Sequence, residues 1–394
     1  MNFVLFDDTS RGHLLPLTFT RPVCEIRAGI TTIREKWESW LKSKVSYITQ
    51  DYLSVKFPLV TGQENICING SVIPDDGLLR KIAGLKPGQA IIKGDIPVAF
   101  YAGEEDIRGF NLDFKGFDTL EYSAEFLKIS RLWDIFLLNG ELIRRDFAEI
   151  TEGRKSASLS SSNTIIAAEN IFAEEDAVIE AATLNGKAGP VYIGKGAEIM
   201  EGAVVRGPFA ICDHSILKLS AKIYGPTTIG PHSRVGGEVN NSVFQGYSNK
   251  AHDGFLGQAV IGEWCNIGAD SNNSNLKNNY AEVRLWDYTE EKFVNTGQLF
   301  CGLIMGDHSK CGINTMFNTG TVVGVSANIF GSGFPRNFIP DFSWGGAHGF
   351  TTFTLPKAFE VAEKIMERRQ VDFDSREKDI LTKVYQLTEK HRKF

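Results

Sequence analysis

The feature that most constrains this chain is a spacing of six residues between apolar positions, sustained through its central part. Eight consecutive positions at this spacing are all apolar: Ile193, Ile199, Val205, Ile211, Leu217, Ile223, Ile229 and Val235. A period of six fits neither the 3.6-residue repeat of an α-helix nor the two-residue alternation of a long strand. It is typical of a β-solenoid, in which a short strand points one side chain inward and the chain then turns a corner.

Shorter runs with the same period flank this one. They are Ile166, Phe172, Val178 and Leu184 before it, and Phe255, Ile261, Ile267 and then Leu299, Met305, Cys311, Phe317, Val323 and Ile329 after it. The stretch from Gly186 to Gly349 also holds 26 of the 39 glycines, which predicts many tight corners. A glycine-rich β-sandwich is the alternative, but its strands would alternate with a period of two. We therefore expect residues 163–345 to form a parallel β-helix of hexapeptide repeats.

The chain follows other patterns on either side of this region. Residues 1–120 alternate short apolar strands with helical segments, as expected for an open α/β sheet. Residues 121–162 are predicted to be a helical linker, broken at Asn139-Gly140. Residues 346–394 contain two stretches of helical periodicity, and we expect this C-terminal helical segment to cap the last coil or pack beside it, because an open strand edge needs covering.

Composition excludes several classes of protein. The net charge is −6 with no block of like charge, which argues against a nucleic-acid partner held by phosphate neutralisation. Six scattered cysteines form no CxxC pair, so buried thiols in a reducing cytoplasm are the better interpretation. The first residues do not resemble a signal peptide, and no apolar stretch has the roughly 20 residues that cross a bilayer. We expect a cytoplasmic protein without a membrane partner.

Two stretches carry a resemblance to a known family. The first runs from Asn249 to Gly262 and has an Asn, a His, an aromatic residue, a Gly and an Ile-Gly corner in order; the second is Leu14-Leu15-Pro16-Leu17-Thr18 with Arg21-Pro22. The chain resembles the bifunctional N-acetylglucosamine-1-phosphate uridylyltransferase/glucosamine-1-phosphate acetyltransferase family and sugar-1-phosphate nucleotidylyltransferases generally. The resemblance implies an α/β nucleotidylyltransferase-like domain, then a left-handed parallel β-helix that forms a homotrimer with acetyl-coenzyme A sites between subunits.

The resemblance also implies roles for residues of the β-helix. His252 matches the family's general base, and a neutral imidazole can take the proton released as a nitrogen attacks a thioester. The alternative is a structural or simply exposed corner histidine. Phe255 and Asn275 match substrate-binding positions. The family's phosphate-binding Arg and Lys are Ile211 and Asn240 here, so another cation must replace them if the acceptor is a sugar phosphate. The candidates are Lys218, Lys222, Arg234 and Lys250, of which Lys250 lies within the matching segment.

The long polar stretch from Ser271 to about Gly297 has no six-residue period. A solvated loop or a stacked asparagine ladder is one interpretation. A lid that covers a substrate is the other.

The N-terminal domain departs further from the family. Two acids, Asp7 and Asp8, follow the first strand where the family has a glycine-rich loop that holds a triphosphate. Arg11 matches the family's arginine in that loop, and Arg21 belongs to the Arg-Pro element. Asp95 in Gly94-Asp95 matches the magnesium-binding carboxylate, with Asn69-Gly70 as a competing strand end and a turn aspartate as the alternative.

Together these observations imply an enzyme with two activities. A sugar-1-phosphate nucleotidylyltransferase of the UDP- or dTDP-sugar pyrophosphorylase type would join a sugar-1-phosphate to a nucleoside triphosphate with Mg²⁺. A coenzyme-A-dependent acetyltransferase-like β-helix would act beside it, in nucleotide-sugar and cell-envelope precursor synthesis. Two alternatives stay open: an acyltransferase with a degenerate nucleotide-binding domain, and a non-catalytic trimeric binding or scaffold protein.

Overall fold

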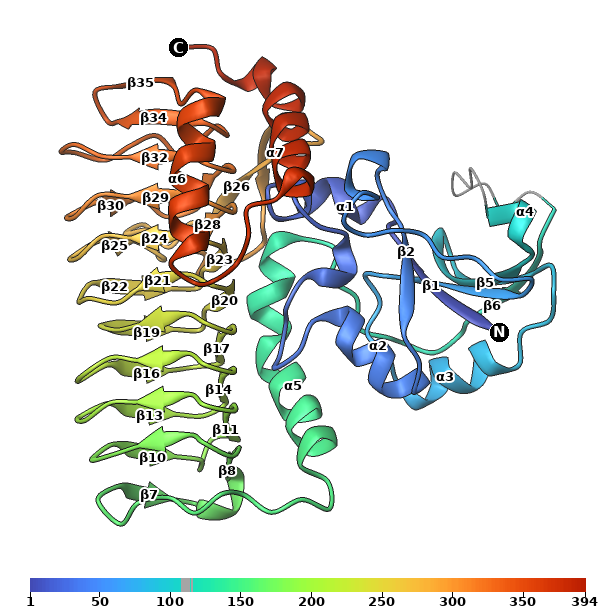
Figure 1. Cartoon of the computed structure of the whole chain (residues 1–394), viewed down its shortest axis with the longest axis horizontal. Coiled ribbons are helices and arrows are strands. Elements are labelled where there is room, and N and C mark those ends of the chain that lie inside the picture. The colour runs from blue at the N-terminus through green and yellow to red at the C-terminus, as the bar shows by residue number, and fades with distance from the viewer. Residues whose placement is uncertain (108–113, 115) are drawn as a thin grey trace. The chain divides into compact units, whose positions relative to one another are not determined.

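The computed structural model describes residues 1–107, 114 and 116–394 and divides into two compact units (Figure 1). The first unit comprises Met1–Leu14, Thr20–Ile26 and Thr31–Arg131. The second comprises Leu15–Phe19, Arg27–Ile30 and Leu132–Phe394. The sequence boundaries at residues 120, 162 and 345 stay a prediction. Among the described residues, no helix is long and apolar enough to cross a membrane.

The first unit is built on one mixed sheet of six strands in the order β2-β1-β3-β5-β4-β6. Strands β1, β2 and β3 run parallel, whereas β5 pairs antiparallel with both β3 and β4. The strands are β1 (Asn2–Phe6), β2 (Val45–Ile48), β3 (Asn65–Asn69), β4 (Gln89–Lys93), β5 (Ile96–Ala102) and β6 (Asp118–Glu121), and the helices are α1 (Ser10–His13), α2 (Ile33–Leu41), α3 (Asp76–Ala83) and α4 (Glu104–Ile107). The expected α/β sheet is confirmed.

Two longer helices of this unit begin at capping residues that the sequence supplies. Thr32 and Glu35 form a capping box at the start of α2, and Asp75 accepts a hydrogen bond from the Leu78 amide at the start of α3. The sheet buries a core that includes Val4, Phe6 and Phe100.

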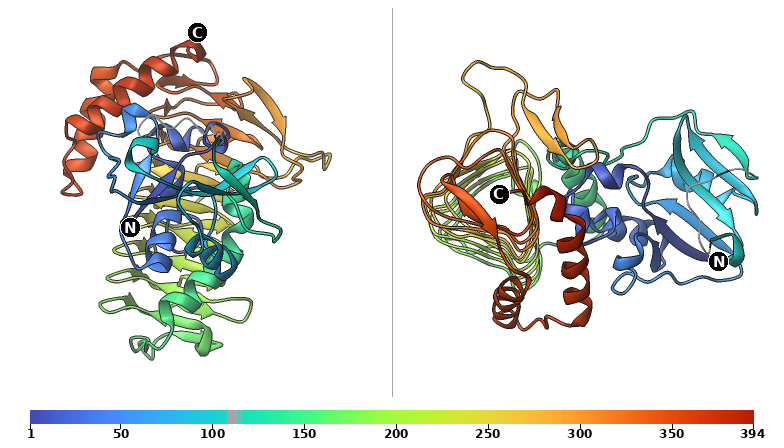
Figure 2. Two further views of the ribbon diagram at one scale, coloured as in Figure 1. Left: turned by 90° about the vertical axis from the view of Figure 1, so that its right-hand side faces the viewer. Right: turned by 90° about the horizontal axis from the view of Figure 1, so that it is seen from above.

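The second unit is a parallel β-solenoid with three faces, seen end-on in Figure 2. The first face consists of β7 (Thr164–Ile166), β10 (Thr183–Asn185), β13 (Val204–Arg206), β16 (Lys222–Tyr224), β19 (Glu238–Asn240) and β22 (Phe255–Gly257), continued by β25 (Asn272–Asn273) and β30 (Met316–Phe317). The second face consists of β8 (Ile171–Ala173), β11 (Val191–Ile193), β14 (Phe209–Ile211), β17 (Thr227–Ile229), β20 (Val243–Gly246), β23 (Val260–Glu263), β28 (Leu303–Met305), β31 (Thr321–Val323) and β33 (Phe338–Ile339).

The third face completes each coil. It consists of β9 (Val178–Ile179), β12 (Glu198–Ile199), β15 (Ile216–Leu217), β18 (Arg234–Val235), β21 (Asn249–Lys250), β24 (Asn266–Ile267), β29 (Lys310–Cys311), β32 (Asn328–Ile329) and β34 (Ser343–Gly346), with β35 (Gly349–Thr352) antiparallel at its end. An antiparallel hairpin of β26 (Arg284–Asp287) and β27 (Lys292–Asn295) leaves the coil between β25 and β28. The polar stretch after Ser271 is thus a strand of the coil followed by a hairpin.

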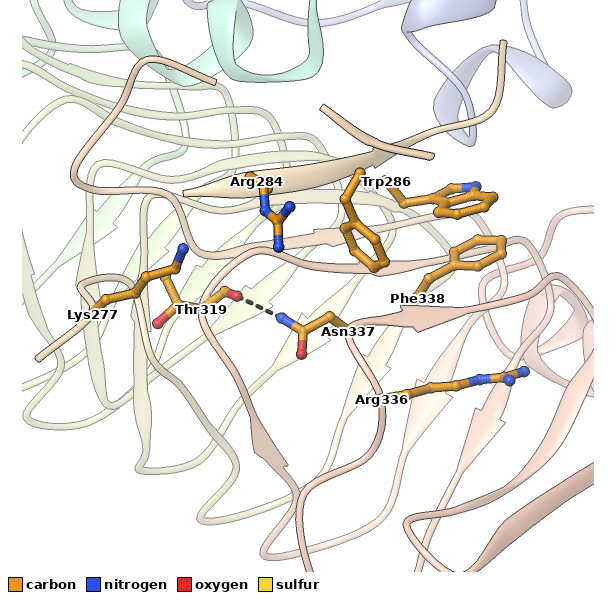
Figure 3. Close-up of a pocket in the computed structure, with 8 residues that line it drawn as sticks. Lys277, Arg284, Trp286, Thr319, Arg336, Asn337 and Phe338 are labelled. Carbon is orange, nitrogen blue, oxygen red and sulfur yellow. Dashed lines mark hydrogen bonds between the residues drawn. The ribbon is translucent and has the colours of Figure 1, made fainter. Parts of the chain in front are cut away.

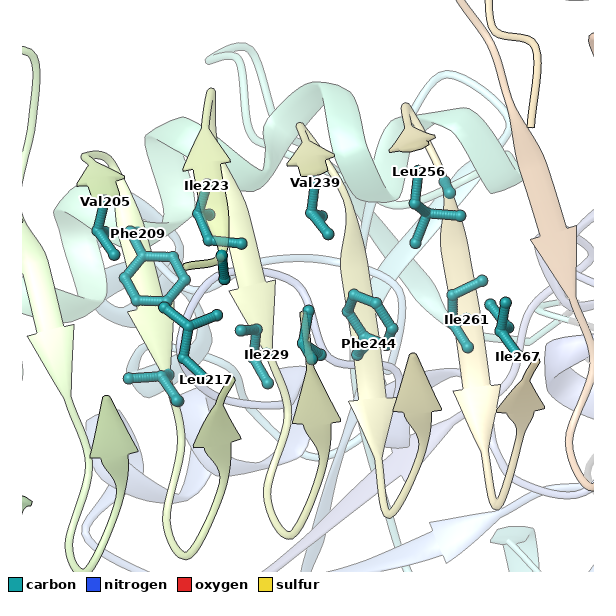
Figure 4. Packing of buried hydrophobic residues seen from close by; sticks show 14 of the residues in the cluster. Val205, Phe209, Leu217, Ile223, Ile229, Val239, Phe244, Leu256, Ile261 and Ile267 are labelled. Atoms are coloured by element: carbon teal, nitrogen blue, oxygen red, sulfur yellow. The ribbon is translucent and has the colours of Figure 1, made fainter. Parts of the chain in front are cut away.

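The eight apolar positions of the main run all point into the solenoid. Each has at most 1% of its surface exposed, and Figure 4 shows Val205, Leu217 and Ile223 among those that fill the interior. Stacking these side chains removes a continuous apolar column from water. The burial stabilises the fold by roughly 25 cal/mol for each Å² of apolar surface. The expected fold class, an α/β domain followed by a left-handed parallel β-helix and C-terminal helices, is confirmed.

The three runs that flank the main one were predicted in part wrongly. In the run that begins at Phe255, the inward residue is Leu256, which lies opposite Val239. Ile166 and Val178 are exposed and Phe172 packs outside the solenoid. The inward residues are Ile165, Ala173 and Ile179, which lie opposite Leu184, Ile193 and Ile199. The spacing between these partners is nineteen or twenty residues instead of eighteen. Leu299 is also exposed, since it belongs to the chain that returns from the hairpin. The remaining members of the last run are buried.

Helix α5 (Leu132–Thr151) packs along the second face, and the predicted break at Asn139-Gly140 is wrong. The fully buried Asn139 side chain accepts a hydrogen bond from the Gly29 amide at 2.8 Å and donates one to the Pro226 carbonyl at 3.1 Å. Gly140 lies directly against Pro226. These two residues are therefore helical, and they allow the helix to approach a corner of the solenoid closely.

Five rings stack along the corner between the second and third faces. They are His214, His232, Tyr247, Trp264 and His308, with successive centroids 4.2–6.3 Å apart, and we call them the corner stack. Each residue has a positive φ between 53° and 60°, a conformation that costs a non-glycine residue energy. The corner therefore repeats one backbone turn coil after coil and stacks its side chains.

Helices α6 (Leu355–Glu367) and α7 (Ser375–Leu387) form the expected C-terminal helical segment (Figures 1 and 2). Just after α6, Arg369 donates a hydrogen bond to the Asn249 side chain on the third face at 3.1 Å. The segment thus packs beside the coils.

Replacing Gly140 tests the packing of α5. A Cβ at this position would lie 2.8 Å from Cγ of Pro226, so Gly140→Ala should lower the unfolding free energy by about 1–3 kcal/mol, although alanine is the better helix former. Chemical denaturation measures this loss, with Glu141→Ala on the exposed side of the helix as the matched control. A Gly140→Ala protein as stable as the control would show that the helix does not approach the corner this closely.

Candidate functional site

The two acids after β1 are used inside the first unit. Asp7 accepts hydrogen bonds from the Val23 amide at 2.8 Å and from the Thr49 hydroxyl at 2.6 Å, and burial raises its pKa to about 6. Asp8 forms an ion pair with Lys128 at 3.0 Å and accepts bonds from Ser10. Burial opposes ionisation of Asp8, but Lys128 and these hydrogen bonds outweigh it and lower its pKa. Both carboxylates are thus held by the protein itself.

The carboxyl end of β3 lies next to that of β1. Phe6 pairs with Asn69, and the buried Asn69 amide donates to Asp8 at 2.9 Å and to the Pro97 carbonyl at 2.7 Å. Asp95 instead occupies the exposed turn between β4 and β5. Of the two strand ends considered from the sequence, the one that neighbours β1 is Asn69-Gly70, which carries no carboxylate.

The two arginines predicted to bind substrate differ in their surroundings. The half-buried Arg11 donates to the Tyr52 hydroxyl at 2.9 Å, and its Nε lies 3.5 Å from Asp7. Arg21 is buried, with 6% of its surface exposed. Arg11 is therefore the better placed of the two to meet a ligand at the end of β1.

Asp95 is the carboxylate predicted to bind magnesium. Among the described residues no three His, Cys, Asp or Glu side chains cluster as metal ligands. Asp95 is one exposed carboxylate, and Asp7 and Asp8 already have protein partners. A Mg²⁺ ion can be held by one carboxylate when substrate phosphates and water complete its shell, so binding of Mg²⁺ through Asp95 stays a prediction.

His252 lies at the corner between β21 and β22, with its side chain exposed. The preceding Lys250 is turned into the solenoid, at the position that Val235 occupies one coil earlier. Its ammonium donates to the carbonyls of Gly236 at 3.0 Å and His252 at 2.7 Å. Lys250 is only 2% exposed, and in this structure it fixes the backbone that carries His252. Substrate binding by Lys250 stays a prediction.

Phe255 and Asn275 lie on neighbouring coils of the first face. The Phe255 amide donates to the side chain of Asn272 at 2.7 Å, and Asn275 donates to Gln258. A Cβ on Gly257 would meet both the Phe255 ring and the Asn275 amide, so the two side chains converge over this glycine. The structure thus brings Phe255 and Asn275 together; their role with His252 stays a prediction.

A cavity of about 600 Å³ opens beneath the β26–β27 hairpin, and we call it the hairpin pocket (Figure 3). It is lined by Lys277, Arg284, Trp286, Phe293, Thr319, Arg336, Asn337 and Phe338. Trp286 stacks on Phe338 with centroids 4.2 Å apart, and Asn337 donates to the Thr319 carbonyl at 2.7 Å. Figure 3 shows Arg284 directed from the hairpin toward Asn337.

Three cations beside flat rings suit a ligand that carries both phosphate and an aromatic base. The sequence interpretation of a substrate-covering segment pointed to this region but missed the pocket residues. Lys277 precedes the hairpin, and the other residues come from the hairpin and from two later coils. They are up to 61 positions apart in the sequence, so no local motif marks them.

A chain that joins an α/β unit to a parallel β-solenoid has known relatives. Residues 3–155 match the family described as sugar nucleotidyl transferase. The chain is 28% identical over 213 residues to a bifunctional sugar-1-phosphate nucleotidylyltransferase/acetyltransferase of Sulfurisphaera tokodaii, covering 54% of this chain and 46% of the relative. It thus spans about half the length of that curated relative. Both findings confirm the resemblance.

Two solved structures match part of the chain at low sequence identity. An Arabidopsis UDP-N-acetylglucosamine acyltransferase matches with a TM-score of 0.27 and 16% identity, over 59% of this chain and 89% of its own. The UDP-N-acetylglucosamine acyltransferase of Bacteroides fragilis matches with a TM-score of 0.29 and 13% identity, over 59% and 91%.

The buried Lys250 predicts a dependence of stability on pH. Burial lowers its pKa from 10.5 to about 8, so the unfolded chain binds this proton more tightly and the folded state gains stability as pH rises from 8 to 10.5. The penalty below pH 8 amounts to roughly 3 kcal/mol, which the two carbonyl hydrogen bonds offset in part. Lys250→Met should therefore be at least as stable as the wild type at pH 7 and lose this advantage by pH 10.

Thermal unfolding of both proteins from pH 7 to pH 10 measures that change. Lys222→Met on the exposed first face is the control and should stay parallel to the wild type. A constant difference between Lys250→Met and the wild type at every pH would contradict a buried ammonium.

Proposed function

We propose that this chain is a bifunctional transferase of nucleotide-sugar synthesis, with a nucleotidylyltransferase site in the first unit and an acyltransferase site on the solenoid. The observation that carries the proposal is the union, in one chain, of a segment matching sugar nucleotidyl transferases with a β-solenoid. The name of the curated relative joins nucleotidyl transfer with acetyl transfer. Its substrates would be a sugar-1-phosphate, a nucleoside triphosphate with Mg²⁺, and acetyl-coenzyme A. The products would be used in the synthesis of cell-envelope precursors.

The acyl step assigned to the solenoid uses the exposed imidazole of His252. The acceptor nitrogen or hydroxyl attacks the thioester carbonyl, a new C–N or C–O bond forms, and the C–S bond breaks to release the coenzyme A thiol. His252 takes the proton of the acceptor and returns it to the leaving thiolate. Lys250 supports this role, because it holds the His252 carbonyl and so the direction of the side chain.

The hairpin pocket would receive the nucleotide part of a substrate, either coenzyme A or a nucleotide sugar. Its guanidinium groups would bind phosphate oxygens, and Trp286 or Phe293 would contact the base. Family resemblance further suggests that the solenoid works as a homotrimer, with acyl-donor sites between subunits.

A second candidate function is acyl transfer alone. Asp7 and Asp8 lie where a triphosphate-binding loop is expected, and both are committed to hydrogen bonds within the unit. Carboxylates at this place repel phosphate unless a metal intervenes. This observation favours a first unit that has lost nucleotidyl transfer and retains binding.

Paired variants separate the two activities. His252→Ala should lower the rate of acyl transfer by 10²- to 10⁴-fold and leave nucleotide-sugar formation intact, because only the first reaction needs the imidazole. Arg11→Gln should lower nucleotide-sugar formation at least tenfold and leave acyl transfer intact. Product mass spectrometry with acetyl-coenzyme A, UTP or dTTP and a panel of hexose- and hexosamine-1-phosphates measures both.

Matched controls are the exposed His348→Ala and Arg80→Gln, which should leave both rates unchanged. Acyl transfer that persists in His252→Ala would overturn the general-base role. Acyl transfer without any nucleotide sugar from the wild type would favour the second candidate function.

Arg284→Gln tests the hairpin pocket. Removing a guanidinium that binds a substrate phosphate should raise the KM of the nucleotide-bearing substrate about tenfold with little change in kcat. Steady-state kinetics measure this, with Arg206→Gln on the first face as the control. An unchanged KM for both coenzyme A and nucleotide would exclude the pocket as their site.

A further inference from the structure

A second cavity, of about 330 Å³, lies between the third face of the solenoid and the end of α6, and we call it the basic pocket. It is lined by Arg234, Asn249, Trp264, Cys265, Asn266, Lys310, Ile365, Arg368 and Arg369. None of its lining residues belongs to the hairpin pocket or to the corner that carries His252. The basic pocket is therefore a separate feature of the second unit.

Four cations converge on this cavity from two strands and from the segment after α6. Arg234 and Lys310 come from β18 and β29, and Arg368 and Arg369 follow α6. None of the described residues lining the cavity is acidic, and none of the four cations forms an ion pair within the described part of the chain. The Lys310 ammonium donates to the His308 carbonyl at 2.6 Å, and Arg369 donates to Asn249 at 3.1 Å. The polar partners that the protein supplies are thus neutral.

This grouping costs the folded protein electrostatic energy. Burial, together with the nearby charges of Arg234 and Arg368, lowers the pKa of Arg369. Burial also lowers the pKa of Lys310 to about 8. Cations at the end of a helix complement its dipole, and this explains Arg368 and Arg369. It does not explain Arg234 and Lys310, which lie on the strands opposite.

We propose that the basic pocket binds a phosphate-bearing anion, as a free phosphate or pyrophosphate ion or as the phosphate group of a larger ligand. A dianion would neutralise the like charges that the fold brings together, and guanidinium groups can bind phosphate oxygens in pairs. The amides of Asn249 and Asn266 add neutral donors, and the edge of the corner stack at Trp264 forms an apolar wall. The volume has room for a diphosphate.

Titration calorimetry of the full chain with inorganic pyrophosphate, and then with inorganic phosphate, tests this site. The wild type should bind pyrophosphate, with affinity falling as salt rises from 50 to 200 mM because the attraction is between charges. Arg369→Gln and Lys310→Gln should each weaken binding at least tenfold. Arg206→Gln, an exposed arginine on the first face, should leave it unchanged.

Thermal unfolding shows whether Arg369→Gln loses anion binding because the cation is gone or because the protein is less stable. Without anion, the thermal midpoint of Arg369→Gln should equal or exceed that of the wild type, because one of the repelling charges is gone. Added pyrophosphate should raise the midpoint of the wild type and leave that of Arg369→Gln in place. A midpoint that responds equally in both proteins would overturn the proposal, as would absence of pyrophosphate and phosphate binding to the wild type.

A nucleoside diphosphate distinguishes the two sources of the phosphate. Binding at least tenfold tighter than that of pyrophosphate, and lost in Arg369→Gln, would support the phosphate of a larger ligand. Equal or weaker binding, also lost in Arg369→Gln, would support a free ion. Nucleoside diphosphate binding that survives in both Arg369→Gln and Lys310→Gln would place the anion elsewhere and contradict the proposal. Activity of the proposed transferase sites enters none of these measurements.

Discussion

The second unit depends on the pairing of each strand with the strand one coil away. Because all three faces pair in parallel and in register, one inward position per strand repeats as a continuous column of apolar side chains. Coil length can change only if the corner absorbs the difference. The partner of Ile229 in the next coil is Phe244, fifteen positions on, and the partner of Ala173 is Ile193, twenty positions on. The pairing between strands is kept when the coil length changes, but the six-residue spacing of apolar positions is lost.

This constraint explains how much of the fold could be predicted. Where coils keep eighteen residues, the period of six located the inward positions, as at Ile193–Val235. It failed at Ile166 and Val178, where the coils are one and two residues longer than eighteen. It also could not foresee Lys250, since a charged residue in an apolar column is only allowed by carbonyls that the corner turns inward. Asn-Gly is typical of a turn, so the sequence predicted a break at Asn139-Gly140. In the fold both residues lie within α5 and contact Pro226 of the solenoid.

Site residues that lie within one short motif could be found from the sequence, whereas residues gathered from distant segments could not. Motif resemblance singled out His252, Phe255 and Asn275, because their neighbours along the chain carry the signal. It could not decide between Asp95 and Asn69, because which strand lies beside β1 depends on sheet order. The hairpin pocket and the basic pocket were missed, since each gathers cations from segments far apart in the sequence. These groups lie on outward-facing strand positions, in or beside the hairpin insertion, before β33 and after α6, because the interior of the coil is filled by apolar side chains.

The account's central claim is that one chain combines nucleotidyl transfer with acyl transfer on the solenoid. The most direct measurement is mass spectrometry of the products formed by the wild-type chain from one hexosamine-1-phosphate, a nucleoside triphosphate, Mg²⁺ and acetyl-coenzyme A, with each co-substrate also omitted in turn. The account predicts one product that carries both the nucleotide and the acyl group, and singly modified products when either co-substrate is left out. The absence of either modification from the products of the complete mixture would contradict it.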